Sequence, residues 1–283
     1  MVQTLSTESR NIEKSLQGRE TQDGAGVRLT RIIGQPLQQR LDPFLMLDYF
    51  RSDDPNDYIR GFPEHPHRGF ETLTILLQGR MRHRDNRGNE GVIEAGGAQW
   101  MLAGRGIIHS EMPEQDQGHL EGFQLWINLP SHEKMAHPRY QDLSVADIPA
   151  IQIGRANLRV IMGSFQNIKG PLQRPQTEPL VLDISLARGE HLSVPLKNRQ
   201  HAAFFVTQGE LRVGDDLLAN RHLGVLGDEG NTVDIEAISD CRLLFIAGTP
   251  LNEHIASYGP FVMNSPEEIH MAISDFQSGK FGS

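Results

Sequence analysis

The chain has 283 residues, of which 38% are hydrophobic and 22% charged, and its formal net charge is −9. This length allows one large or two ordinary domains, and the acidic balance disfavours direct nucleic-acid binding, which relies on clustered Lys and Arg. The apolar runs are far shorter than the ~20 residues of a membrane-spanning helix, and the first residues lack the apolar core of a signal peptide.

The cysteine content bears on disulfide formation and on the cellular compartment. The chain has one cysteine, Cys241, so an intrachain disulfide is excluded. This is compatible with a reducing compartment, and we expect a cytoplasmic protein with no membrane contact. Because Cys241 lies in an apolar run, we expect its thiol to be inert core.

Short apolar runs followed by turn residues predict strands along most of the chain. Many short strands at this spacing are typical of an all-β sandwich or barrel. The clearest runs are residues 44–47, 71–77, 123–129, 180–186, 204–207 and 241–247.

Two short helices are expected beside these strands. The first lies within residues 131–140 and ends near Pro138. The second begins after Ser265 as N-cap, has proline and glutamate in its first turn, and runs to about Phe276.

A weak internal repeat relates the two halves of the chain. Residues 71–81 match residues 201–211, and both segments are apolar strands that end in Gln-Gly. Aligned on that glycine, His65 falls on Pro195 and His67 on Lys197. The repeat therefore predicts two domains of similar topology, with terminal strands exchanged between them.

The domain boundary is expected near the irregular stretch around Pro149. We accordingly assign residues 1–145 to an N-terminal metal-binding domain. Residues 146–283 form a C-terminal domain that lacks metal ligands and ends in the predicted helix.

Two short motifs carry the chemistry, His65-Pro66-His67 and His109-Ser110-Glu111. Side chains two residues apart on a strand point to the same face. Two such pairs on neighbouring strands would aim three imidazoles and one carboxylate at one point, a set that binds a divalent first-row transition metal. Glu71 also lies an even number of residues from His67, and strand periodicity does not choose between Glu71 and Glu111.

The wider sequence around these motifs resembles the pirin family of double cupins. The resemblance lies in His-Pro-His-Arg-Gly-Phe-Glu-Thr at 65–72 and in the run from Gln99 to Met112. It extends to residues 41–48, 124–130 and 259–264. It implies an all-β bicupin fold, with two β-barrel or jelly-roll domains packed face to face and a few short helices.

The resemblance also implies the metal site. Its ligands would be His65, His67, His109 and Glu111, and the metal would be one divalent transition ion. Fe(II) is the first choice, and Mn, Ni, Cu or Zn are compatible with the same donors. Glu111 would be both ligand and catalytic base, and Glu71 would then be a neighbouring structural residue. Four ligands in an octahedral scheme leave two open positions.

Two functions follow from the resemblance. The first is a quercetin 2,3-dioxygenase-like enzyme that opens flavonols with O₂, so its partners would be a small aromatic substrate and O₂. The alternative is a non-enzymatic, redox-sensitive iron protein that binds a transcription-related protein partner. We expect a monomer in either case, because two fused cupins already form a pair.

Other residues near the motifs receive ordinary expectations. Gln124, Trp126 and Asn128 alternate along one strand face, which faces either the pocket or a core. Arg68 is expected to form an ion pair rather than steer a substrate. His83 has no paired ligand nearby in the sequence, so no metal role is expected for it.

Overall fold

The computed structural model describes residues 8–281, which divide into two compact units. We call residues 19–147 with 251–281 the histidine unit, and residues 8–18 with 148–250 the apolar unit. The predicted boundary at 145/146 is close to the division after Asp147. Residues 8–18 and 251–281, however, belong to the opposite unit from the one that the continuous ranges 1–145 and 146–283 assign to them.

The histidine unit contains a seven-stranded sheet, a four-stranded sheet and a small hairpin. The large sheet runs in the order β12 (Arg139–Leu143), β9 (Ala98–Leu102), β6 (Phe70–Gln78), β11 (Leu120–Asn128), β4 (Phe44–Ser52), β3 (Val27–Ile33) and β2 (Arg19–Asp23). The smaller sheet runs β5 (Phe62–His67), β10 (Ile107–Pro113), β7 (Arg80–Asp85) and β8 (Glu90–Glu94). The hairpin pairs β25 (Ala256–Tyr258) with β26 (Phe261–Met263).

The apolar unit has the same set of sheets. Its large sheet runs β1 (Ile12–Gln17), β22 (His222–Leu226), β19 (His201–Gln208), β24 (Cys241–Gly248), β17 (Leu180–Leu186), β14 (Ala156–Met162) and β13 (Ala150–Ile153). The smaller sheet runs β18 (His191–Pro195), β23 (Thr232–Ala237), β20 (Leu211–Val213) and β21 (Asp216–Leu218), and β15 (Ser164–Phe165) pairs with β16 (Ile168–Lys169).

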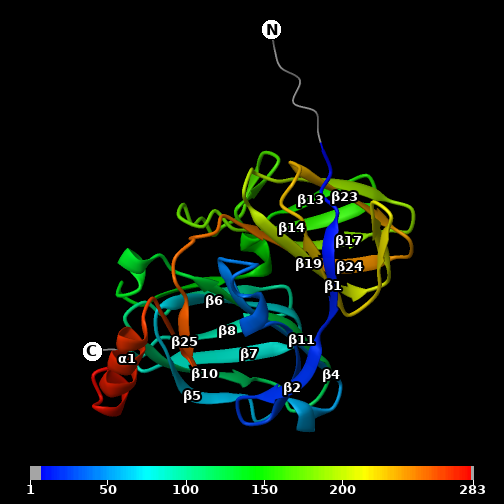
Figure 1. Cartoon of the computed structure of the whole chain (residues 1–283). Helices are drawn as coiled ribbons and strands as arrows, with labels where there is room; N and C mark the ends of the chain where they lie inside the picture. The colour runs from blue at the N-terminus through cyan, green and yellow to red at the C-terminus, as the bar shows by residue number, and fades with distance from the viewer. Residues whose placement is uncertain (1–7, 282–283) are drawn as a thin grey trace. The chain divides into compact units, whose positions relative to one another are not determined.

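The two sheet orders correspond strand for strand, which confirms the internal repeat. The Gln-Gly turns that carry the repeat have equivalent backbones, with φ of +90° at Gly79 and +77° at Gly209. Only the edge strand differs in origin, because the place of β12 in one unit is taken in the other by β1, from the start of the chain. Figure 1 shows β1 in blue along the strands of the apolar unit. Exchange of a terminal strand is therefore confirmed, whereas face-to-face packing of the domains stays a prediction.

The sequence predictions of elements are mostly confirmed. The run at 180–186 coincides with β17, and the other five predicted strands overlap β4, β6, β11, β19 and β24. Helix α1 (Pro266–Gln277) has the predicted capping box between Ser265 and Glu268. The helix predicted within 131–140 is wrong. Only the turn η3 (Ser131–Glu133) is helical, and β12 begins directly after Pro138.

Three more short 3₁₀ turns complete the described elements, η1 (Gln35–Leu37), η2 (Pro55–Asp57) and η4 (Val145–Asp147).

The two units differ in the side chains that lie between their sheets. The interior of the apolar unit is a continuous cluster of buried aliphatic and aromatic side chains, including Val194, Phe204, Val233 and Phe245. Within residues 8–281, the structure has no helix long and apolar enough to cross a membrane.

Candidate metal centre

The two histidine motifs lie on neighbouring antiparallel strands of the histidine unit, as the sequence predicts. The pairing of β10 with β5 places His109 directly opposite His65. His67 lies two residues after His65 on the same strand, so its side chain faces the same side. Two three-residue motifs that lie far apart in the chain are thus brought to one point by a single strand pairing.

The three imidazoles form one cluster. Their candidate ligand atoms all lie within 4.8 Å of one another, and this is the one such metal-ligating group found in residues 8–281. The Nε2 atoms of His65 and His67 are 3.0 Å apart, and the ring of His109 lies 4.4 Å from that of His65 and 5.0 Å from that of His67. The nitrogen atoms therefore converge in the way a shared cation requires.

The electrostatics of the cluster favour metal binding. Burial, together with the neighbouring imidazoles, lowers the pKa of both His67 and His109 well below the usual value. Neutral imidazole is the form that ligates a metal. Both ring nitrogens of His109 are buried without a hydrogen-bond partner in the described chain. The residues present therefore fit a divalent transition metal.

Glu111 lies two residues after His109 on β10 and faces the same interior. Its Oε1 accepts a hydrogen bond of 2.9 Å from Thr74, and its Oε2 accepts one of 2.8 Å from the Gln124 amide. Glu111 does not belong to the group whose ligand atoms all lie within 4.8 Å of one another. The geometry thus holds Glu111 beside the cluster, and its role as fourth ligand stays a prediction.

Glu71 has a different environment. Its side chain is fully buried, and its Oε2 accepts a 3.0 Å hydrogen bond from the indole nitrogen of Trp100. Trp100 lies on β9, the neighbour of β6 in the large sheet. Glu71 is therefore engaged within the large sheet, which supports the structural role that the family resemblance implies for it.

A row of polar side chains crosses the large sheet at the level of the cluster. Strand register places Arg31 opposite Asp48, Asp48 opposite Gln124, Gln124 opposite Thr74, Thr74 opposite Gln99, and Gln99 opposite Asp142. Arg31 binds both carboxylate oxygens of Asp48, at 2.9 and 2.7 Å. Since Gln124 and Thr74 also hold Glu111, this row links the large sheet to the metal-side strand β10.

The alternating face of β11 that contains Gln124 faces the site. The Trp126 ring lies 5.1 Å from that of His67 and stacks on Phe70 at 4.2 Å. Asn128 is different, because its Oδ1 accepts from the buried amine of Lys134 at 2.8 Å. Two of the three residues predicted to share a pocket-facing set thus lie at the cluster, and the third joins a separate polar contact.

The segment after residue 250 supports the loop that follows His67. Arg68 donates to the carbonyl of Arg105 at 2.6 Å and to Asp275 of α1 at 2.9 Å, so its ion-pair partner is distant in sequence. A Cβ at Gly69 would lie 2.0 Å from the carbonyl oxygen of Val262, which explains the glycine there. The residues that follow the ligand strand β5 are therefore held in place by α1 and by β26.

Sequence reasoning missed His83. It lies on β7 directly opposite Glu111, its ring is 5.5 Å from that of His109, and it is buried. Burial lowers its pKa. The Tyr140 ring lies 4.3 Å from His83, and burial raises the pKa of its phenol. His83 lies on a third strand and has no ligand-type residue two positions away except Asp85, so the local pattern gave no signal.

The corresponding position of the apolar unit has no metal ligands. Where the histidine unit pairs His65 with His109, the register of β18 and β23 pairs Val194 with Val233, and both are fully buried. Pro195, which the sequence repeat aligns with His65, is exposed. Side chains of a strand alternate between its two faces, so the residue of β18 that faces the interior is Val194 and not Pro195. The sequence alignment of the repeat is therefore off by one residue at this strand.

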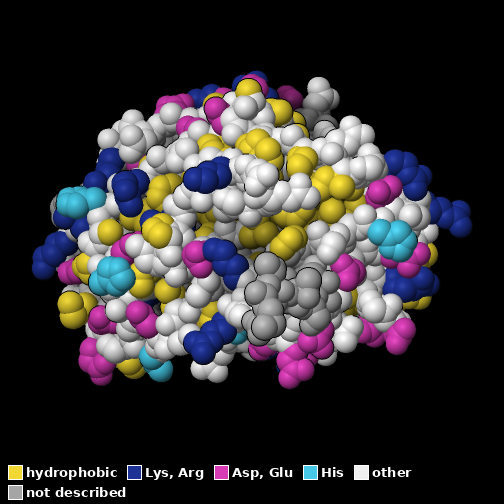
Figure 2. All heavy atoms as spheres, turned by 90° about the horizontal axis from the view of Figure 1, so that it is seen from above, with side chains coloured by type: hydrophobic (Ala, Val, Ile, Leu, Met, Phe, Trp, Pro, Cys, Tyr) yellow, Lys and Arg dark blue, Asp and Glu magenta, His cyan; other side chains and the backbone are white. Residues whose placement is uncertain are grey.

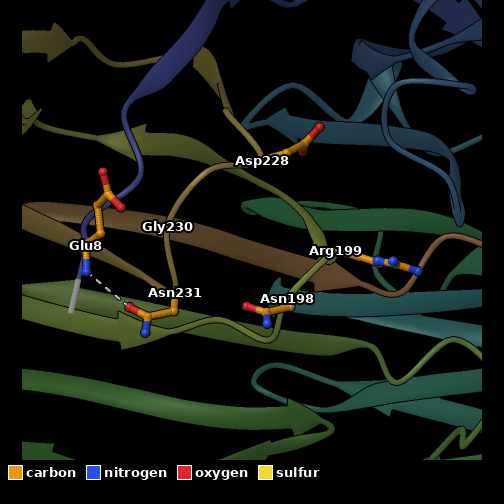
Figure 3. A pocket seen from close by; sticks show the side chains of 6 residues that line it. All are labelled: Glu8, Asn198, Arg199, Asp228, Gly230 and Asn231. Atoms are coloured by element: carbon orange, nitrogen blue, oxygen red, sulfur yellow. Dashed lines mark hydrogen bonds between the residues drawn. The ribbon is translucent and has the colours of Figure 1, made fainter. Parts of the chain in front are cut away.

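A polar surface pocket lies at the loops of the apolar unit. It is lined by Glu8, Asn198, Arg199, Asp228, Gly230 and Asn231, and the Glu8 amide donates to the Asn231 side chain at 3.2 Å (Figure 3). It contains no group of metal-ligating side chains of the kind found in the histidine unit. On the face drawn in Figure 2, Lys and Arg side chains are interspersed with Asp and Glu.

Comparisons with known proteins extend over almost the whole chain. Residues 26–127 match the family model described as Pirin, and residues 181–282 match the model described as the Pirin C-terminal cupin domain. A pirin-like protein of Caulobacter vibrioides is 47% identical over 274 residues, which span 96% of this chain and 99% of the relative.

Two further matches carry an enzyme name. A Pseudomonas aeruginosa protein provisionally named quercetin 2,3-dioxygenase is 45% identical over 281 residues, spanning 96% of this chain and 98% of its own. The crystal structure of quercetin 2,3-dioxygenase from Acinetobacter baumannii matches with a TM-score of 0.92 at 36% identity and covers 98% of this chain and 99% of that one. The bicupin architecture is shared with that structure.

Proposed function

The chain belongs to the pirin family, and we propose that it is a metal-dependent dioxygenase that opens flavonols such as quercetin with O₂. The observation that carries this proposal is the cluster of the half-buried His65 and the buried His67 and His109, with Glu111 held beside it. The enzyme names of two similar proteins supply the substrate class.

The proposal gives each residue of the cluster a role. His65, His67 and His109 would hold the metal, with Glu111 as the fourth ligand. When bound, a divalent transition metal acts as a Lewis acid toward the substrate hydroxyl. We propose one such ion per chain, Fe(II), because three imidazoles and one carboxylate resemble a non-haem iron site with one added ligand.

In this proposal Glu111 receives the proton of the flavonol hydroxyl. Thr74 and Gln124 fix both of its oxygens, so its orientation does not have to be established during the reaction. Trp126 and Phe70 provide an aromatic wall next to His67, against which a flat apolar ring system packs. Burial of the cluster limits water access to the reacting groups.

Aerobic turnover tests the proposal. Protein loaded anaerobically with Fe(II) should consume O₂ and quercetin in equal amounts, with release of carbon monoxide and loss of the flavonol absorption band. Glu111→Gln keeps the size of the side chain but removes the base, so turnover should fall by roughly 10²-fold or more. A control variant in the apolar unit, His222→Ala, should turn over normally.

One result of this turnover experiment would contradict the enzyme assignment. If iron, manganese, nickel and copper forms all leave the flavonol unchanged, the enzyme assignment is wrong. The regulatory alternative would then be tested by whether iron oxidation changes the affinity for a protein partner. Cytoplasmic location and a monomeric state remain part of the proposal.

A further inference from the structure

His83 is buried beside the candidate metal centre, and within residues 8–281 its ring nitrogens have no hydrogen-bond partner. Only 2% of its surface is exposed. The hydroxyl oxygen of Tyr140 is likewise buried and unpartnered, and the two rings are 4.3 Å apart. An unpaired buried polar group costs about 1–3 kcal/mol, so three such atoms at one place point to a bound ligand.

The two side chains come from opposite sheets of the histidine unit. His83 lies on β7 of the four-stranded sheet, opposite Glu111, and Tyr140 lies on β12 at the edge of the large sheet. The His83 ring is 5.5 Å from that of His109. The pair therefore adjoins the imidazole cluster on the side of Glu111.

Nearby groups do not supply the missing partners. Asp85 interacts with the Tyr140 hydroxyl, but no hydrogen bond of regular geometry joins the two. Oδ1 of Asp85 accepts from the backbone amides of Arg87 and Asn89, and Oδ2 accepts from the Asn89 side chain. Glu111 faces His83 across the strand pair, but no hydrogen bond joins the two side chains; the Glu111 oxygens accept from Thr74 and Gln124. The hydrogen-bonding capacity of His83 and Tyr140 is thus directed to something other than these side chains.

We propose that His83 and Tyr140 form a binding subsite for a hydroxyl group of the aromatic substrate, next to the metal centre. An imidazole and a phenol each offer one donor and one acceptor, which together match a hydroxyl, itself both donor and acceptor. A site built to hydrogen-bond a hydroxyl discriminates strongly against an analogue that lacks it. The inference rests on the proposed function, because the substrate is taken to be a polyhydroxylated aromatic compound.

Binding rather than turnover tests the subsite. Zinc-loaded protein is titrated with quercetin and with 3-hydroxyflavone, which keeps the hydroxyl and carbonyl of the reacting ring but lacks the other hydroxyls. The wild type should bind quercetin more tightly. Tyr140→Phe and His83→Phe should each weaken quercetin binding about ten-fold and change 3-hydroxyflavone binding less than two-fold.

Stability of the ligand-free protein supplies a second readout. Tyr140→Phe removes only an unpartnered hydroxyl, so its melting temperature should equal or exceed that of the wild type. The matched control is Tyr58→Phe, which removes a buried hydroxyl that donates to the Gly118 carbonyl at 2.8 Å. That control should melt lower and keep the wild-type ratio of flavonol affinities. A purely structural Tyr140 would behave like Tyr58.

Each contrary result has its own meaning. Unchanged affinity ratios in both Phe variants would overturn the subsite and leave the proposed function intact. Metal content well below one equivalent in His83→Phe would identify His83 as a ligand instead and would also overturn the subsite. If the wild type binds neither flavonol, the proposed function itself fails. His83→Gln, which keeps a donor and an acceptor, replaces the Phe variant if that does not fold, and should keep most of the preference.

Discussion

Six strands of the large sheet carry one row of side chains across each unit, and the two rows have opposite chemistry. In the histidine unit the row is Arg31, Asp48, Gln124, Thr74, Gln99 and Asp142. In the apolar unit the corresponding strands carry Val160, Leu182, Phe245, Phe204, Gly224 and Ser15. The same topology thus supports either a polar interior that can hold a metal or a hydrophobic one, in which only the edge strand contributes a polar residue, the exposed Ser15.

The difference shows what each unit uses for cohesion. Phe204 and Phe245 are fully buried at the centre of the hydrophobic cluster, and each large buried side chain contributes about 1.5–3 kcal/mol by removal from water. Thr74 and Gln124, at the same places, instead hold Glu111. The histidine unit therefore gives up hydrophobic burial at its centre in exchange for an oriented carboxylate beside three imidazoles.

Buried cations tie terminal segments into both units. In the apolar unit, Arg10 is fully buried and donates to the carbonyls of Gln200 at 2.6 Å and Gly230 at 2.9 Å, with longer bonds to Gly227 and Lys197. In the histidine unit, Lys134 donates to the Gly69 carbonyl, the Val262 carbonyl and the Asn128 side chain at 2.8–3.0 Å. The two cations act alike but differ in their response to pH.

The largest expected effect concerns the metal. His109→Ala should lower metal affinity by roughly 10³-fold or more, because loss of an outer partner alone accounts for about 10- to 100-fold. Elemental analysis of purified protein should find near one equivalent in the wild type and almost none in the variant. Folding should be retained, since the unit's sheets do not depend on that side chain.

His222→Ala in the apolar unit is the matched control and should keep the full metal content. The comparison between the units would collapse if His109→Ala retained one equivalent, or if metal were lost equally from both variants.

The second largest expected effect is a loss of stability in the apolar unit. Phe245→Gln places the residue of the polar row in the hydrophobic row and should lower the free energy of unfolding by about 4 kcal/mol, through the cavity and the unpaired amide. Urea denaturation followed by circular dichroism measures it. Metal content should remain near one equivalent. An unchanged midpoint would show that this interior tolerates polar groups and that the contrast between the rows has little energetic meaning.

Much of the fold could be predicted from sequence because its signals are local. Apolar runs ending in Gly-centred turns gave β6 and β17, and the capping box at Ser265 gave α1. The failure at 131–140 has a physical cause, since the hydrophilic run there can form one 3₁₀ turn before Pro138 and then an edge strand. The origin of β1 as the counterpart of β12 was predicted only as a strand exchange, without its register.

The site was predictable where its residues lie two apart on a strand. His65 with His67, and His109 with Glu111, follow that period, and the structure brings the three imidazoles together. His83 and Gln124 reach the same place through pairing of strands distant in the chain. Such contacts depend on register between strands, which composition and spacing do not contain.

The two buried cations should respond differently to alkali. Burial lowers the pKa of Lys134 from 10.5 to about 8. Between these values the unfolded chain binds more protons than the folded one, so stability should rise as pH increases from 8 to 10.5, by up to about 3 kcal/mol. Lys134→Met should lack this rise in urea titrations at several pH values.

Arg10 provides the contrast, because a guanidinium stays charged across that range. Arg10→Met should lower stability by a similar amount at every pH. A slope that is the same in the wild type and in Lys134→Met would mean that the hydrogen bonds to the ammonium keep it charged in the fold.

Substitutions of Glu111 and Glu71 should change different measured quantities, metal affinity for the first and stability for the second. Glu111→Ala should weaken metal binding roughly 100-fold, whereas Glu71→Ala should leave metal binding nearly unchanged and lower stability by about 1–3 kcal/mol, since Trp100 loses a buried acceptor. Competition with a chelator measures the first effect and urea denaturation the second. The opposite ranking of metal affinities would make Glu71 the ligand and would place the site closer to the large sheet.

The smallest expected effect tests whether the polar row serves the metal. Gln124→Leu removes the amide that holds Oε2 of Glu111 and keeps nearly the same volume. Metal affinity should fall about ten-fold, because the carboxylate loses one of its two orienting bonds while the imidazoles remain. Stability should fall by about 1–2 kcal/mol, since one oxygen of the buried Glu111 carboxylate loses its donor. Chelator competition and urea denaturation on the same preparation give both values. Unchanged metal affinity together with a large loss of stability would mean that the row exists to hold the sheet together, as the phenylalanines do in the apolar unit, and that the polar interior contributes nothing to the metal centre.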